Sequence, residues 1–373
     1  MALRPEDVRR VLVYRIGSLG DTIVALPALH QIARCFPHAE RRLLTNFPIE
    51  AKAPAASVIL GDSGLVHGYM RYAIGTRSLS ELLRLRKEIR AFNPDVLVYL
   101  MPLRPPMAVL RDHIFFRLAG IRQIHGLPGA EELRYGFDPA TGLHESEASR
   151  LARSIRTLGA VNLSDAANWD LQLSDVESQK AHNFLAPHQG RSIICCGPGT
   201  KMQCKDWGAE RWAKLLKRLS RQLPDHLLLM VGSAQEFDEC EQIAASWQGE
   251  KVNLCGQFSP REVVPLLAAS RVYLGTDSGQ MHLAACVGTP CACVFAARNL
   301  PGIWFPPGDR NRILYHKTDC YNCLLATCID QGKKCIYSIT VDEMAHAVGE
   351  ILHLPTLQIA EAQPVPDTPE LKG

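Results

Sequence analysis

The residues with the clearest chemical potential lie in the segment 15–22, whose sequence is RIGSLGDT. Gly17 and Gly20 follow an apolar run and precede a helical pattern, so they would let the backbone come close to a ligand. Asp21 then falls at a helix start, where the positive end of the helix dipole favours an ionised carboxylate that can act as a general base. The structural alternative is a tight turn with Asp21 as the helix N-cap. The segment is not a P-loop, because no Gly-Lys-Ser/Thr follows, and it is not a dinucleotide fingerprint, because its glycine spacing differs.

A second loop, at 197–207 with the sequence GPGTKMQCKDW, has the composition of a phosphate site. Thr200 and the backbone N–H groups beside the glycines can bind phosphate oxygens, and Lys205 can neutralise a diphosphate. Lys201 is a further candidate contact in the same loop. The alternative is a glycine-rich loop whose lysines are simply solvated.

A third loop, at 275–282, reads GTDSGQMH. We expect a buried strand to end at Asp277 and a helix to begin at Ser278, so that Ser278 and Gly279 present N–H groups to an anion. His282 lies one helical turn further on and could face the same ligand. Alternatively, Ser278 only caps the helix and His282 is a buried structural histidine.

Glu236, in the segment 232–236 after another apolar run, is a weaker candidate. Its carboxylate could accept hydrogen bonds from ribose hydroxyls, as acidic residues do in nucleotide sites. The alternative role is a favourable negative charge at a helix N-terminus.

These loops need parallel strands to position them, and apolar runs alternate with helical patterns along most of the chain. Strand-like runs at 11–15 and 96–101 lie on either side of a helix at 78–92, which Ser78 and Glu81 begin as a capping box. Pro27 interrupts the helical spacing of apolar residues at 23–32. The second half predicts strands at 192–196, 227–231, 272–275 and 291–295, and helices at 209–222, 236–247, 260–269, 278–286 and 340–352. The region 104–173 is less regular.

The pattern predicts an α/β chain with two Rossmann-like parallel-sheet domains that face each other across a cleft. We expect an N-terminal, acceptor-binding domain at 1–178, which carries Asp21. A C-terminal, donor-binding domain should follow at 179–354 and include a cysteine-rich loop at 318–336. The Pro-rich segment 355–373 reads as a flexible tail.

Composition excludes several functional classes. The chain has 373 residues, with 41 Lys plus Arg against 38 Asp plus Glu, so its formal charge of +3 argues against a nucleic-acid partner. The charged start MALRPEDVRR is unlike a signal peptide, and no apolar run is long enough to span a membrane. Thirteen cysteines without an export signal indicate a reducing, cytoplasmic setting with mostly free thiols.

Four of the cysteines crowd into one polar loop: Cys320, Cys323, Cys328 and Cys335. Four thiolates at short spacing can hold zinc or iron tetrahedrally, and such a site would be structural because no ligand position stays open for substrate. The last pair is separated by six residues, which departs from the usual paired CxxC pattern. The alternative is a loop of free or disulfide-prone cysteines.

Recognition of an acceptor should fall in the N-terminal half, where arginines could bind sugar carboxylates or phosphates. The candidates are Arg71, Arg77, Arg104, Arg111, Arg117 and Arg122. Phe115 and Phe116 could touch a membrane surface. The structural alternatives are that the arginines are solvated on the surface and that the two phenylalanines pack in a core.

Taken together, the four loops resemble those of glycosyltransferase family 9, the heptosyltransferases of lipopolysaccharide core assembly and their relatives. The similar segments are RIGSLGDTIVALPAL, GPGTKMQCKDW and GTDSGQMHLAACVGTP, in this order, and the resemblance runs from residue 11 to about 351. It implies a GT-B fold with the nucleotide-sugar donor on the C-terminal domain. It also implies inverting transfer that needs no metal or other cofactor, with possible peripheral contact at the cytoplasmic face of the inner membrane.

The same resemblance assigns roles to residues. Asp21 matches the catalytic aspartate that deprotonates the acceptor hydroxyl, Thr200 and Lys205 match donor-phosphate contacts, and Glu236 matches a ribose contact. The remaining matches belong to the loop for the donor sugar and diphosphate, namely Asp277, Ser278, Gly279 and His282. Related autotransporter heptosyltransferases hold iron with four cysteines, which is the resemblance-based reason to consider a metal in the cysteine loop.

The chemistry agrees with a single displacement, because a lysine and a helix N-terminus can stabilise a leaving diphosphate without Mg²⁺. A retaining route would want a second carboxylate beside the sugar, and Asp277 lies poorly for that role. We therefore expect transfer of a heptose from an ADP-linked donor to a lipopolysaccharide-type or other glycan. The alternatives are another nucleotide-diphosphate sugar, a protein acceptor, or a non-catalytic nucleotide-binding relative.

Overall fold

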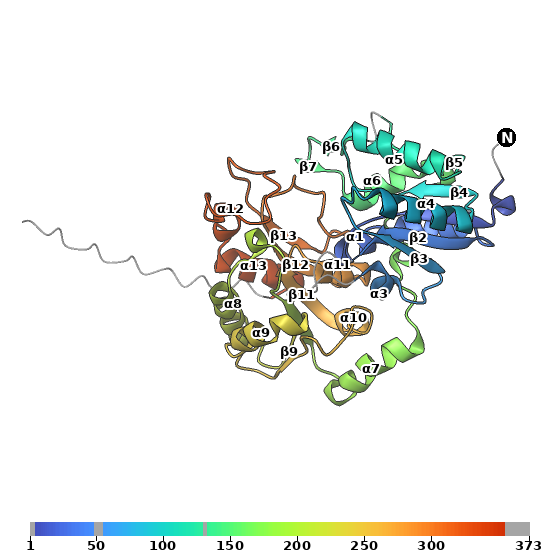
Figure 1. Cartoon of the computed structure of the whole chain (residues 1–373). Coiled ribbons are helices and arrows are strands. Elements are labelled where there is room, and N and C mark those ends of the chain that lie inside the picture. The colour runs from blue at the N-terminus through green and yellow to red at the C-terminus, as the bar shows by residue number, and fades with distance from the viewer. Residues whose placement is uncertain (1–3, 48–54, 130–132, 355–373) are drawn as a thin grey trace, which may run out of the picture.

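The computed structural model describes residues 4–47, 55–129 and 133–354 and contains two parallel sheets, each covered by helices (Figure 1). The tail at 355–373 lies outside the described residues. The first sheet has the order β3-β2-β1-β4-β5. Its strands are β1 (Arg10–Tyr14), β2 (Glu40–Asn46), β3 (Gly68–Tyr72), β4 (Val96–Tyr99) and β5 (Gln123–His125). The prediction of a parallel-sheet α/β fold is confirmed for this half.

The second sheet has the order β10-β9-β8-β11-β12-β13, and all of its paired strands are parallel. Its strands are β8 (Ile193–Gly197), β9 (Leu227–Met230), β10 (Lys251–Asn253), β11 (Ser270–Thr276), β12 (Cys291–Phe295) and β13 (Arg312–Tyr315). Both sheets have the Rossmann-like order, in which strands are added first on one side of the first strand and then on its other side, so that the strand order reverses there. The reversal lies between β1 and β4 in one sheet and between β8 and β11 in the other, and ligands bind at such points.

Helices cover both faces of both sheets. Those associated with the first half are α1 (Leu19–Ile23), α2 (Leu26–Cys35), α3 (Ala56–Leu60), α4 (Leu79–Phe92), α5 (Pro106–Leu118) and α6 (Glu147–Ser154). Those that follow are α7 (Asp175–Leu185), α8 (Ala209–Gln222), α9 (Phe237–Ala244), α10 (Val264–Ala268), α11 (Gly279–Cys286), α12 (Lys334–Tyr337) and α13 (Val341–Leu352). A short hairpin joins β6 (Phe137–Asp138) to β7 (Leu143–His144). Among the described helices, none is both long and apolar enough to cross a membrane.

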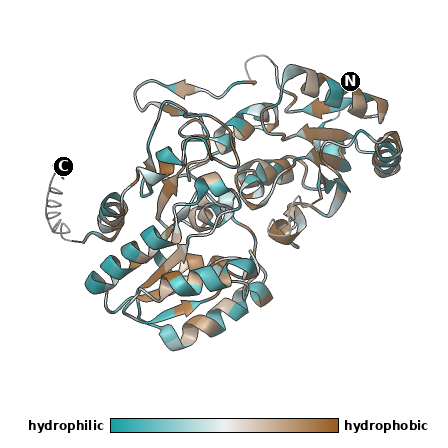
Figure 2. Ribbon diagram, turned by 60° about the vertical axis from the view of Figure 1, so that its left-hand side comes forward, coloured by the Kyte–Doolittle hydropathy of each residue, from teal (hydrophilic) through white to brown (hydrophobic). Residues whose placement is uncertain are grey.

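Strand alternation divides the core into three clusters. Val11 and Val13 of β1 face a central cluster, whereas Leu12 and Tyr14 face an outer cluster with α4 and α5. In the second sheet, Ile193 of β8 faces the same central cluster, and its neighbours face an outer cluster with α8, α9 and α13. Figure 2 shows the strands as predominantly hydrophobic ribbons between helices with hydrophilic outer faces. The central cluster therefore joins the two sheets into one packed body.

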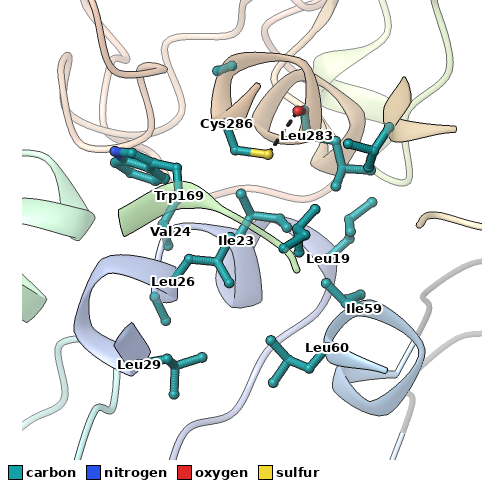
Figure 3. Packing of buried hydrophobic residues seen from close by; sticks show 14 of the residues in the cluster. Leu19, Ile23, Val24, Leu26, Leu29, Ile59, Leu60, Trp169, Leu283 and Cys286 are labelled. Carbon is teal, nitrogen blue, oxygen red and sulfur yellow. Dashed lines mark hydrogen bonds between the residues drawn. The ribbon is translucent and has the colours of Figure 1, made fainter. Parts of the chain in front are cut away.

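The join between the sheets is made mainly by α1 and α11. Figure 3 shows side chains of α1, α2, α3 and α11 meeting in one apolar group, with Leu19 of α1 near Leu283 of α11. Gly279 and Gly20 allow this approach, because a Cβ on Gly279 would lie 2.6 Å from Cγ of Leu19 and a Cβ on Gly20 would lie 2.9 Å from Cδ2 of His282. A side chain at either glycine would therefore force the neighbouring group on the other helix to shift.

Most predicted elements are present, with shifted ends. The helix at 209–222 and the strand at 291–295 agree with α8 and β12, whereas the helices predicted at 236–247 and 260–269 shorten to α9 and α10. Pro27 breaks the first helical pattern into α1 and α2, where it occupies the opening turn of α2. Ser78 caps α4 as expected, but the Glu81 carboxylate accepts from Ala73 N and Thr76 Oγ1 instead of closing the capping box. The predicted domain boundary between 178 and 179 falls inside α7 and stays a prediction.

Candidate active site

One cavity, with a volume of about 540 Å³, lies where the carboxyl ends of the two sheets meet. It is lined from the first sheet by the turn at 18–21 and from the second sheet by the loops after β8, β9, β10, β11 and β12. The predicted residues that line it are Gly20, Asp21, Thr200, Lys201, Lys205, Glu236, Asp277, Ser278, Gly279 and His282. Gly17 does not line it, but its φ of +135° and the nearby Asp21 side chain leave room only for glycine. The four loops picked out by the sequence therefore form one site.

Asp21 is held at the mouth of this cavity by the first turn of α1. It is not the N-cap that the structural alternative predicted, because Ser18 takes that place and Asp21 is the third helical residue. Its Oδ2 accepts from Ser18 N at 2.9 Å, and its Oδ1 lies 3.9 Å from Arg15. The side chain is 28% exposed. One carboxylate oxygen is thus held by the turn, and the other lies near the Arg15 guanidinium.

Arg15 ties this turn to a buried charged network. Its guanidinium donates to the Asp21 carbonyl and to Glu147 Oε1, both at 2.9 Å, and Glu147 also accepts from Arg150 at 2.7 Å. Burial alone would raise the pKa of Glu147, but the Arg150 hydrogen bond and the two arginine charges outweigh it and hold that pKa below its usual value. Tyr135 Oη donates to the same carboxylate at 2.9 Å. The sequence prediction missed this network, whose members are far apart along the chain.

A largely buried ion pair forms the opposite wall. Lys205 Nζ lies 2.7 Å from Asp277 Oδ2 and 3.1 Å from the Asp277 carbonyl, and the two side chains are only 14% and 7% exposed. The pair joins the loop after β8 to the loop after β11 across the point where the strand order reverses. The solvated-lysine alternative is therefore wrong for Lys205, which places a largely buried positive charge beside the cavity.

The start of α11 supplies N–H groups to the same wall. Ser278 is its N-cap residue, but its hydroxyl makes no capping hydrogen bond, so the first-turn N–H groups are available to an anion. His282 follows on the next turn and is buried against Trp304, with ring centroids 6.2 Å apart. Burial lowers the pKa of His282 to about 4, with the Lys205 charge acting in the same direction, so the imidazole is neutral at pH 7.

Glu236 has the helix-start role that the sequence left open, and its side chain also lines the cavity. Its Oε2 accepts from Ser233 N at 2.7 Å and from Ser233 Oγ at 2.8 Å, which makes it part of a capping box. The same side chain lines the cavity beside Gly199. The cavity continues past Glu236 into an apolar end formed by Leu254, Phe258, Pro260 and Val263. A flat nucleobase suits such a surface.

The loop after β12 adds cavity residues that the sequence prediction missed, namely Arg298, Asn299 and Trp304. Arg298 donates to the carbonyls of Leu324 and Leu325, both at 2.8 Å, so the cysteine-rich loop holds it in place. Its position just after a buried strand, at the same sheet edge as Asp277, was the available signal.

The cysteine-rich loop does not have the arrangement expected of a metal centre. Within 4–47, 55–129 and 133–354, no three His, Cys, Asp or Glu side chains are placed to hold a metal ion. Cys323 is exposed, Cys328 is buried, and Cys320 and Cys335 are intermediate; all are free thiols. Contacts with the loop after β8 hold this segment instead, since Gln203 Oε1 accepts from Cys328 N at 2.9 Å. The four thiols do not fit zinc or iron in this conformation, which favours the free-cysteine alternative.

The predicted acceptor arginines do not reach the cavity. All six lie within the described residues, and none lines it. Arg104 and Arg111 instead bind Asp112, and Arg117 donates to the Arg122 carbonyl. Phe116 is 2% exposed and packs edge-on against Tyr14, so the membrane role suggested for it is wrong. Phe115 packs against the same cluster.

Comparisons with known proteins point in one direction. The family model described as "Glycosyltransferase family 9 (heptosyltransferase)" matches residues 145–334. The chain is 23% identical over 350 residues to lipooligosaccharide heptosyltransferase 2 of Campylobacter jejuni serotype O:2, covering 92% of this chain and 98% of that protein.

Two solved structures share the fold. A glycosyl transferase family 9 protein from Veillonella parvula aligns with a TM-score of 0.68 at 16% identity, covering 95% of this chain and 99% of its own. The E. coli ADP-heptose LPS heptosyltransferase II aligns with a TM-score of 0.62 at 18% identity, covering 92% of this chain and 98% of its own. The prediction of two facing Rossmann-like domains in the GT-B arrangement is confirmed by this likeness.

Proposed function

Because the chain belongs to glycosyltransferase family 9 and is a glycosyltransferase, we propose that it transfers a heptose from an ADP-linked donor to a lipopolysaccharide-type glycan. The observation that carries the proposal is the cavity shared by both sheets, with Asp21 on one side and the Lys205–Asp277 pair on the other. An acid–base group and an anion-binding wall on opposite sides are what a displacement at an activated sugar requires.

In the proposed reaction, Asp21 accepts the proton of an acceptor hydroxyl as its oxygen attacks the anomeric carbon. The bond from that carbon to the diphosphate breaks on the opposite face, so the configuration inverts. Lys205 and the first-turn N–H groups of α11 bind the departing diphosphate and stabilise its charge. These groups can provide the electrophilic assistance that Mg²⁺ provides elsewhere, so we propose that transfer needs no metal.

Donor recognition is assigned to the second half of the chain, from 179 to 354. Thr200, Lys201, Ser278 and Gly279 would contact the diphosphate, and Glu236 would accept from the ribose hydroxyls. The apolar end with Phe258 suits the base. Acceptor recognition is assigned to 1–178. The thirteen cysteines are free thiols, which supports a reducing compartment such as the cytoplasm.

The test compares Asp21→Asn with the wild type and with Asp95→Asn. Asp95 is a matched control, because its Oδ2 also accepts a backbone N–H, at 2.9 Å, but at the amino end of β1, away from the cavity. We expect Asp21→Asn to lower the transfer rate by about 100-fold or more, the usual contribution of a general base. Binding of ADP, followed by thermal shift, should persist in both variants.

Transfer that is unchanged in Asp21→Asn would remove this residue as the base. If the wild type binds ADP but transfers no sugar to any glycan or protein acceptor, the non-catalytic relative becomes the better description. If it transfers a sugar other than heptose, the family-level function holds and the donor assignment fails.

A further inference from the structure

The outer face of α5 carries a continuous row of exposed apolar side chains. Met107, Leu110, Ile114 and Leu118 are 74%, 50%, 48% and 58% exposed. They are separated by three or four residues, so they share one side of the helix. We call these four residues the α5 stripe.

The opposite side of α5 already packs on the sheet. Val109, Asp112 and Phe116 are buried there, and Phe116 belongs to the outer cluster with Tyr14 and Leu85. The helix is therefore apolar on two sides, and a helix of this kind is normally covered on both sides by other groups. Within the part of the chain that the structure describes, the stripe is left exposed, and a row of this length on a protein surface marks an interaction site.

Positive charge borders the stripe. Arg111 and Arg117 are exposed on either side of the row, and Arg122 is exposed just beyond the helix. The segment 104–122 contains four arginines and a single acidic residue, Asp112, which is buried and already paired with Arg104 and Arg111. The surface around the stripe is therefore basic, although the whole chain has a formal charge of only +3.

The location of α5 relates it to the active site. The helix begins at Pro106, a few residues after the carboxyl end of β4, so its first turn lies at the sheet edge where the cavity opens. It lies on the outside of the first sheet together with α4 (Figure 1). A surface that rests on the stripe would therefore be close to the opening through which an acceptor reaches Asp21.

We propose that the α5 stripe docks onto a membrane surface that contains anionic phospholipids. Exposed apolar side chains beside arginines are the pattern by which a surface helix enters the headgroup region. A second copy of the chain fits less well, because a two-fold interface through the stripe would bring the same arginines face to face. This inference does not depend on the transfer reaction, since docking is measured as binding alone.

The experiment measures co-sedimentation with two kinds of vesicle: phosphatidylcholine alone, and phosphatidylcholine mixed with phosphatidylglycerol. We expect binding to the mixed vesicles that weakens as salt is added. The double variant Leu110→Gln/Ile114→Gln should lose about tenfold or more in affinity, because it removes apolar area from the headgroup contact. Arg117→Gln and Arg122→Gln should each weaken binding about fivefold.

The matched control is Val176→Gln/Ile329→Gln, which changes two apolar side chains away from α5 that are even more exposed, at 83% and 77%. It should bind like the wild type, and all variants should unfold at similar temperatures because every altered side chain is exposed. Equal binding by the stripe variant and the control would overturn the proposal. So would absence of wild-type binding to both vesicles, or wild-type dimers that the stripe variant abolishes without any vesicle binding.

Discussion

Removing the charge of Lys205 tests the cavity wall formed by Lys205, Asp277 and the start of α11, which we propose binds the donor and call the donor wall. In Lys205→Met the Asp277 carboxylate keeps its buried position but loses the ammonium group that lies 2.7 Å away. A buried carboxylate without its partner is strongly destabilising, typically by 3–5 kcal/mol. Since the Lys205 side chain retains 14% exposure, we expect the lower end, about 3 kcal/mol, in urea unfolding.

Lys214→Met is the matched control for burial. Lys214 Nζ and Glu210 Oε1 are also 2.7 Å apart, but these side chains are 64% and 80% exposed. An exposed pair of this kind contributes little or nothing measurable. The two variants therefore remove ion pairs of equal length, and only the one beside the cavity should lower the free energy of unfolding.

The same variant should weaken ADP binding. A hydrogen bond to a charged group contributes about 1.5–3 kcal/mol, so calorimetry with ADP should give a dissociation constant raised about 10- to 100-fold. The double variant Lys205→Met/Asp277→Asn separates the two effects. It should recover stability, because no buried charge is left unpaired, while its affinity for ADP stays low.

Equal stability losses in Lys205→Met and Lys214→Met would refute the reasoning from burial. An ADP affinity that matches the wild type in Lys205→Met would refute the assignment of Lys205 to the diphosphate, whatever happens to stability. A double variant less stable than Lys205→Met would show that Asp277 has partners beyond this pair.

Three further predictions concern the neighbouring groups. Burial lowers the pKa of His282 to about 4, so as the pH falls below 6.5 the unfolded chain gains a proton that the native protein does not. This difference should lower the free energy of unfolding by about 2 kcal/mol at pH 5 relative to pH 7. In urea unfolding, His282→Gln should lose that part of the pH dependence. Gly279→Ala should lower thermal stability by an equivalent of about 1–3 kcal/mol, because its Cβ would lie 2.6 Å from Leu19 Cγ, and adding Leu19→Ala should relieve the loss. Iodoacetamide should label the exposed Cys323 first. Burial raises the pKa of Cys195 to about 12, so mass spectrometry should find this thiol unlabelled until the chain unfolds. A bound metal would instead protect Cys323 until a chelator is added.

The donor wall could be predicted from the sequence because its parts obey a local rule. Each loop follows a short apolar run and contains glycine with a polar residue, and the carboxyl ends of parallel strands share one edge. That rule is sufficient to predict that Thr200, Asp277 and Glu236 lie close together. It could not pair Lys205 with Asp277, which are 72 residues apart, because periodicity does not determine which side chains meet across an edge.

Two features escaped prediction for physical reasons. Helix α5 has apolar residues on both sides, so it lacks the one-sided period that identifies a helix, and the segment reads as irregular. The spacing of the cysteines does not determine the conformation of their loop, because contacts with residues outside the loop determine it. Asn322 and Leu324 have φ near +58° and +57°. Their N–H groups donate to the carbonyls of Ala297 and Arg298. These contacts prevent thiols that are close in sequence from forming a tetrahedral metal site.

The contact between α1 and α11 connects Asp21, the proposed base, directly to the proposed donor site. Leu19 and Gly20 lie directly before Asp21, and they pack against Gly279 and His282 at the start of the helix that would bind the diphosphate. A movement that separates these helices must withdraw Asp21 from the donor wall at the same time, because the same turn of α1 makes both contacts. The base would therefore reach the sugar only when the two halves are closed on it, which also keeps water from the activated donor.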